Sequence, residues 1–335
     1  MKLENISFSP EETGGLEAAA NQQFSQAWAK KYLRKLAERD DRVEVLNRSE
    51  IAAEVATTLM QTLRTTSVQA WAKTEALLSQ EIIRHQIDSQ SLDPWAVTKD
   101  AHQIYQTALS AYAQEIPPPK FSTWIAKDLG DIRHKYIADD PRVMGFISMQ
   151  FHYSGQILLE LTPPNQQPSL SVYLKVIDDH LYMPLQRAYQ AAAKHAYDAP
   201  PLQAVQRILP LCTEIATKIV ERVVQLYPNY ECSTGRLDDA NIKISSVRDV
   251  EMFQVYLWVC ILENNISAVQ QELFPLCVML YPRLKVRWDL VRQLIELLGI
   301  EICSRLEPQQ AAYFVPYYQS LWAMFSPEVF PDNAS

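Results

Sequence analysis

Glycine is scarce in this chain, and its scarcity constrains the fold more than any other feature of the sequence. Only 7 of the 335 residues are glycine, which is about a third of the usual frequency. Hairpin turns, β-bulges and glycine-rich phosphate loops depend on glycine because it adopts backbone conformations that other residues avoid. Helices do not need it, so we expect an all-α protein built as a multi-helix array or bundle.

The spacing of the apolar residues supports this expectation. Phe24, Trp28 and Tyr32 recur every four residues, and the apolar positions from Cys212 to Val223 recur every three or four. Side chains with this spacing lie on one face of an α-helix and pack against the rest of the protein. The hydrophobic content of 48% supplies enough apolar material for a large helical core.

Two segments leave room for one short β element. Residues 241–244 have the pattern of a short strand. Residues 146–161 contain alternating apolar positions, which suit a hairpin that turns at Ser154 and Gly155, and they also fit the period of a helix. We favour the helix over residues 146–161.

A run of three prolines indicates a division of the chain, because consecutive prolines form a stiff, extended spacer. The predicted parts are an N-terminal polar helical module at residues 1–116, a proline linker at 117–119 and a C-terminal helical body at 120–335. Within the first module, we expect the run Thr65-Thr66-Ser67 to interrupt a helix.

The charge balance and the apolar pattern bear on partners and location. The net charge of −8 argues against a nucleic-acid partner, because binding to phosphates needs clustered Lys and Arg. No signal-peptide pattern and no uncharged apolar stretch of about 18 residues is present. We therefore expect a soluble, cytoplasmic protein, with membrane contact peripheral at most. The excess of glutamine over lysine suggests a bacterial source.

The sequence contains no recognisable catalytic, nucleotide or metal motif. Glycine-rich phosphate loops, paired Cys or His ligands at zinc spacing and the G-x-S-x-G elbow are all missing. We therefore predict no catalytic residue, no metal site and no cofactor. The five cysteines are odd in number and widely spaced, a pattern that indicates buried free thiols.

One polar cluster could form a binding site. Asp178, Asp179 and His180 are adjacent within an apolar segment, and paired carboxylates beside an imidazole can bind Mg²⁺ or transfer protons. His152 lies between two aromatic residues and could ligate a planar cofactor. The competing interpretation is a solvated helix edge for the cluster and a hydrogen-bonded core histidine at position 152.

Two further groups could bind a partner. Arg283, Lys285, Arg287 and Arg292 form the one cationic cluster of an acidic chain and could receive an acidic protein surface or an anionic head group. The aromatic residues near the C-terminus, Tyr317, Tyr318 and Trp322 among them, could form a docking face. Solvated charges and core packing are the alternatives.

These observations support three functional hypotheses. The first is a non-enzymatic helical protein for protein–protein interaction, acting as a regulatory or assembly factor. The second is a helical ligand- or cofactor-binding protein, with enzyme activity not excluded, whose pocket lies near His152, Asp178, Asp179 and His180. The third is a peripheral membrane-associated protein.

Overall fold

The computed structural model describes residues 22–33 and 48–331, and most of these residues are helical. In chain order the helices are α3 (Arg48–Arg84), α4 (Pro94–Ala113), α5 (Pro118–Ile137), α6 (Met144–Glu160), α7 (Gln167–Tyr182), α8 (Leu185–Ala193), α9 (Pro200–Ile208), α10 (Cys212–Leu226), α11 (Ala240–Glu263), α12 (Phe274–Arg283), α13 (Trp288–Cys303) and α14 (Pro308–Met324). Residues 22–33 form a further helical segment, and a π-helix, Val269–Leu273, precedes α12. The expected all-α fold is confirmed.

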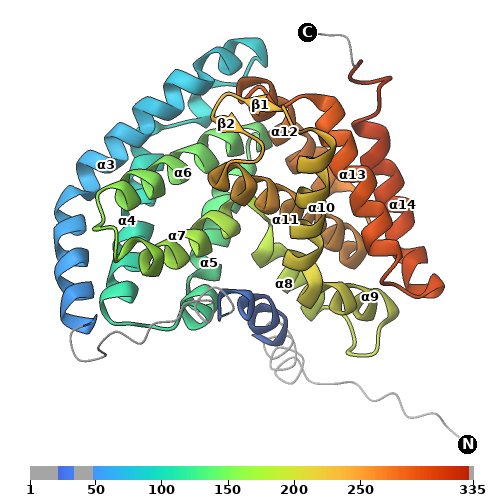
Figure 1. Cartoon of the computed structure of the whole chain (residues 1–335), viewed down its shortest axis with the longest axis horizontal. Helices are drawn as coiled ribbons and strands as arrows, with labels where there is room; N and C mark the ends of the chain where they lie inside the picture. The colour runs from blue at the N-terminus through green and yellow to red at the C-terminus, as the bar shows by residue number, and fades with distance from the viewer. Residues whose placement is uncertain (1–21, 34–47, 332–335) are drawn as a thin grey trace, which may run out of the picture.

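The helices form an array that extends from α3 at one edge to α14 at the other (Figure 1). α3 packs on α4 and α6, α5 packs on α7 and α8, and α10 packs on α11 and α13. α14 packs on α9, α11 and α13. Buried apolar side chains from Phe24 to Phe325 belong to one connected hydrophobic core.

Helix α11 runs through the interior of the array. Every side chain from Val250 to Leu262 is buried, as expected for a helix that other elements cover on all sides. Two residues in this run, Glu251 and Gln254, are polar. A buried polar side chain requires partners, and those of Glu251 define the candidate site below.

Several helix starts follow the local sequence signals. Asp93 caps α4, because its Oδ1 accepts a hydrogen bond from the Trp95 N–H at 2.9 Å. Pro118 occupies the first turn of α5, where a missing N–H is tolerated. The core contains residues from both sides of the three prolines. The division at residues 117–119 stays a prediction, and residues 1–21 and 34–47 of its first module lie outside the described residues.

The expectation of a strand at residues 241–244 is wrong, because these residues belong to the first turns of α11. A strand would place Ile242 and Ile244 on the same face, whereas a helix separates them. Ile242 packs against the core and Ile244 is 56% exposed. The short β element of the described residues is instead the hairpin of β1 (Glu231–Cys232) and β2 (Gly235–Arg236).

Residues 146–161 are helical as favoured, within α6 and its C-terminal cap, and the alternative hairpin is wrong. Side chains are buried all around the first two turns of α6, because every residue from Met144 to Phe151 is buried, so alternating apolar residues carry no information about a strand. The expected break at Thr65-Thr66-Ser67 is also wrong, because α3 continues through it. Gln150 of α6 donates a hydrogen bond to the Ser67 carbonyl at 3.0 Å, which fixes α3 against α6.

The thiols and the molecular surface complete the description. All five cysteines are free, and Cys212, Cys260 and Cys277 are buried, whereas Cys232 is half-buried and Cys303 exposed.

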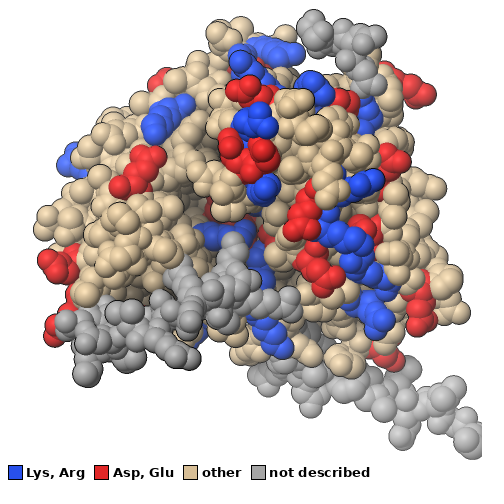
Figure 2. Space-filling view, viewed as in Figure 1, with Lys and Arg blue, Asp and Glu red and all other residues tan. Residues whose placement is uncertain are grey.

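Acidic and basic side chains are interspersed on the face shown in Figure 2. None of the described helices is both long enough and apolar enough to cross a membrane.

Candidate functional site: a cavity beside a buried ion cluster

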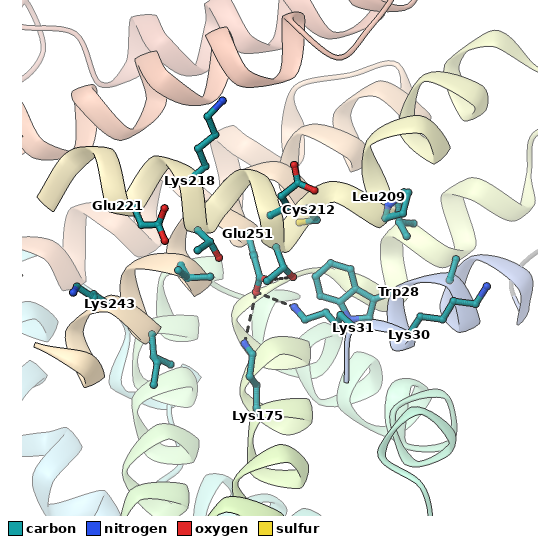
Figure 3. Close-up of a pocket in the computed structure, with 17 residues that line it drawn as sticks. Trp28, Lys30, Lys31, Lys175, Leu209, Cys212, Lys218, Glu221, Lys243 and Glu251 are labelled. Carbon is teal, nitrogen blue, oxygen red and sulfur yellow. Dashed lines mark hydrogen bonds and ion pairs between the residues drawn. The ribbon is translucent and has the colours of Figure 1, made fainter. Parts of the chain in front are cut away.

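A cavity of about 620 Å³, here called the main cavity, opens between segment 22–33, α7, α10 and α11 (Figure 3). Its apolar lining comes from Ala27, Trp28, Leu209, Pro210, Ile244 and Val247. Its charged lining comes from Lys30, Lys31, Lys175, Lys218, Lys243, Glu214, Glu221 and Glu251. The cavity therefore combines an apolar wall with five ammonium groups and three carboxylates.

Four charged side chains at or beside this cavity, here called the ion cluster, are those of Lys31, Lys175, Asp179 and Glu251; the two carboxylates are buried and the two lysines are half-buried. Lys31 Nζ is 2.8 Å from Glu251 Oε2 and 3.0 Å from Asp179 Oδ2. Lys175 Nζ is 2.7 Å from Asp179 Oδ1 and 3.6 Å from Glu251 Oε2. Figure 3 shows Lys31 and Lys175 approaching Glu251 from two different elements. Two ammonium groups thus neutralise two carboxylates that have no exposed surface.

Neutral side chains complete the hydrogen bonding of these carboxylates. Thr213 donates to Glu251 Oε1 at 2.5 Å, and Tyr32 donates to Asp179 Oδ2 at 2.9 Å. Trp28 Nε1 in turn donates to the Tyr32 hydroxyl at 3.3 Å. The Lys31 ammonium lies 3.9 Å from the centroid of the Trp28 ring, so its charge also meets an aromatic face.

The electrostatic environment keeps Asp179, Glu251 and Lys175 in their charged forms. Burial alone raises the pKa of Asp179, but Lys175 and Lys31 outweigh burial and hold that pKa well below its ordinary value. The pKa of Glu251 is lowered for the same reason. Burial acts to lower the pKa of Lys175, and the two carboxylates outweigh it and raise that pKa. Asp179, Glu251 and Lys175 are therefore charged at neutral pH.

A second cavity of about 450 Å³ lies between α6, α7 and the start of α11. His152, Asp178 and Arg248 line it, and Lys175 and Ile244 line both this cavity and the main one. The second cavity is therefore adjacent to the main cavity, with two residues in common.

The charged groups of the second cavity form their own network. Arg248 donates to Asp178 Oδ2 at 2.9 Å and lies 3.8 Å above the Tyr182 ring. His152 Nδ1 is 3.6 Å from Asp178 Oδ1. Burial acts to raise the pKa of Asp178, but Arg248 and then His152 outweigh it and lower that pKa to about 2.

The four predicted pocket residues are thus divided among three environments. His152 and Asp178 meet in the second cavity, whereas Asp179 belongs to the ion cluster. His180 is buried elsewhere, with its Nδ1 2.8 Å from the Val176 carbonyl, and burial lowers its pKa to about 4. Consecutive residues of a helix point about 100° apart, which explains why Asp178, Asp179 and His180 do not converge.

The four predicted cationic residues also differ in their surroundings. Arg283 pairs with the buried carboxylate of Glu81, and Arg287 pairs with Asp289 at 2.8 Å. Arg292 is buried and donates to the carbonyls of residues 325 and 330. The backbone carbonyl of Lys285 accepts a hydrogen bond from Tyr230 at 3.3 Å.

The predicted aromatic residues lie on α14. Tyr317 donates to Asn264 Oδ1 at 2.9 Å, Tyr318 stacks on Phe314, and Trp322 is half-buried against the core. A docking role for these residues and for the cationic group stays a prediction.

Sequence analysis missed most of the residues at the main cavity. Trp28 appeared only as part of an apolar stripe, and Lys31, Lys175 and Glu251 were not identified. A signal was available for one pair, because Lys175 and Asp179 are four residues apart and share a helix face. Another signal was the position of Glu251 inside the apolar run of residues 250–262.

Fold and site together define an all-α helical array with a charged cavity between its helices. Among the described residues, no group of three or more His, Cys, Asp and Glu side chains is arranged to hold a metal ion. The sequence matches no protein-family model, and comparisons with curated proteins and with solved structures gave no significant match.

Proposed function

We propose that this chain is a ligand-binding protein that holds a small organic molecule in the main cavity. The observation that carries the proposal is a cavity of about 620 Å³ that combines an apolar wall with the ion cluster. Cavities that bind small molecules commonly measure about 300–1,000 Å³ and combine apolar walls with a few polar groups.

The ion cluster supports this proposal through its energetic cost. Removing charged groups from water is expensive, and a buried ion pair often stabilises a fold less than apolar residues of similar volume would. Perturbed pKa values beside a cavity are typical of functional sites. The ion cluster meets both conditions, because Asp179 and Glu251 are fully buried and have lowered pKa values.

We rank ligand binding above the interaction and membrane hypotheses. Of the cations predicted to meet a partner, Arg283 and Arg287 pair with carboxylates of this chain and Arg292 is buried. A cytoplasmic location and a bacterial source, as expected from the composition, remain part of the proposal.

The proposal is tested by native mass spectrometry of the chain purified from the organism that makes it. The half-buried Thr217 of α10 lines the main cavity, so Thr217→Trp should fill space that a ligand needs. Arg222 is an exposed residue of α10 that does not line this cavity, so Arg222→Trp is a control that places the same side chain on the same helix outside the cavity.

We expect the wild-type chain and Arg222→Trp to carry the same bound small molecule and Thr217→Trp to carry little or none. Thermal unfolding should show that both variants remain folded. A wild-type chain that carries and takes up no small molecule would refute the proposal, as would undiminished binding by folded Thr217→Trp.

A further inference from the structure

The buried carboxylates at the two cavities already have hydrogen-bond donors. Both oxygens of Glu251 accept hydrogen bonds, from Thr213 and Lys31. Both oxygens of Asp179 do so as well, from Lys175 and Tyr32. Asp178, which is partly exposed, accepts from Arg248 and lies beside His152. A cationic ligand that binds any of these three carboxylates would have to displace these donors.

The cations at the junction of the two cavities, half-buried Lys175 and buried Arg248, retain donor capacity. An ammonium group has three N–H donors, and among the described residues Lys175 Nζ has one hydrogen-bond acceptor, Asp179. Arg248 is 8% exposed, and within the described part of the chain no atom accepts a hydrogen bond from its Nε. Lys175 therefore offers donors to an acceptor on a ligand, with the positive charge of Arg248 beside them.

The shape of the site shows how such a ligand would lie. Lys175 and Ile244 line both cavities, so a molecule at Lys175 can contact the two. The apolar surfaces of Trp28, Leu209 and Val247 line only the main cavity. One end of the site thus suits an anionic group, and the other suits an apolar body.

We infer that the ligand is an amphipathic anion. Its carboxylate or phosphate group binds at Lys175, on the side of Arg248, and its apolar body extends into the main cavity. The inference rests on the proposed function and adds the chemical class and orientation of the ligand. An anion is also favoured by the charges at the main cavity, where five lysines outnumber the four carboxylates of Glu214, Glu221, Glu251 and the ion-cluster residue Asp179.

Calorimetric titration of the full chain with four probes of equal chain length tests the ligand class. The probes are decanoate, decyl phosphate, decyltrimethylammonium and decanol. We expect the anions to bind more tightly than the cation and the alcohol. A comparison of decanoate with decyl phosphate distinguishes a carboxylate site from a phosphate site, and both results support the inference.

A charge series at Ile244 tests the orientation. Ile244 is 56% exposed and lines both cavities, so substitutions there should leave the fold intact. Ile244→Gln is the neutral reference for Ile244→Glu and Ile244→Lys. If the anionic group of the ligand lies within about 8 Å of the side chain at position 244, we expect the Glu variant to bind the preferred anion roughly fivefold more weakly than the Gln variant. The Lys variant should bind this anion more tightly than the Gln variant.

The outcomes separate this inference from the proposed function. If the chain carries a small molecule in the main cavity but neither anionic probe binds, or the cationic probe binds best, the inference is wrong and the proposed function stands. Equal affinities across the Ile244 series would refute the placement of the anionic group. Failure of the Thr217→Trp test would refute the proposed function itself.

Discussion

Replacing Lys31 with methionine removes one of the two ammonium groups that neutralise the ion cluster. Lys175 would remain 2.7 Å from Asp179, but its distance from Glu251 is 3.6 Å. The fully buried carboxylate of Glu251 would therefore lose its closest cation. Methionine keeps most of the apolar stem of lysine, so the change tests the charge more than the packing.

The expected cost follows from the geometry. Removing one partner of a buried ion pair destabilises a protein by about 3–5 kcal/mol. Because Lys175 still pairs with Asp179, we expect Lys31→Met to lower the free energy of unfolding by the smaller value, about 3 kcal/mol. Urea titration followed by circular dichroism measures this free energy. The midpoints of the two proteins can be compared if the dependence of the unfolding free energy on urea concentration is unchanged.

Two further variants make the measurement decisive. Lys30 is an exposed lysine next to Lys31, so Lys30→Met should change stability by less than about 0.5 kcal/mol. Adding Glu251→Gln to Lys31→Met removes the uncompensated charge, and the double variant should recover at least about 1 kcal/mol. A loss below about 1 kcal/mol for Lys31→Met, or no recovery in the double variant, would show that the ion cluster does not act as described.

Three other perturbations give defined outcomes. Burial lowers the pKa of His180 to about 4 in the folded chain, whereas the same imidazole has a pKa of about 6.5 in the unfolded chain, which therefore binds more protons between these values. The free energy of unfolding should fall by up to about 3 kcal/mol as the pH drops through this window, and His180→Gln should reduce this dependence on pH. Glu272→Gln leaves the buried Arg133 without its carboxylate, and urea titration should show a loss of about 3 kcal/mol. Gly299→Ala places a methyl group against the Tyr318 ring, so we expect a loss of about 1–3 kcal/mol that Tyr318→Ala partly restores.

The sequence predicted the fold more fully than the site. The fold class follows from local patterns, whereas the site depends on contacts between residues that are far apart in the chain. Glycine scarcity and the apolar spacing are local properties, and they were sufficient to predict the all-α class. The error at residues 65–67 arose where tertiary packing overrode the local pattern. Gln150 accounts for part of the packing at Ser67, and no local rule predicts it.

The ion cluster required contacts that a single sequence does not reveal. Lys31 and Glu251 are 220 residues apart, and Tyr32 and Asp179 are 147 residues apart. Each charge by itself is compatible with a solvated helix face, which is the commoner place for charged residues. Only the fold shows that these charges meet in one buried cluster.

The adjacent residues Asp178 and Asp179 show why a polar triplet in a helix is a poor guide to a single site. The 100° rotation between neighbours directs Asp178 to Arg248 and Asp179 to Lys31. Lys175 lies four residues before Asp179 and three before Asp178, so it borders both networks. Spacings of three and four residues therefore carry more information about this site than direct adjacency does, and the same geometry connects the two cavities at Lys175.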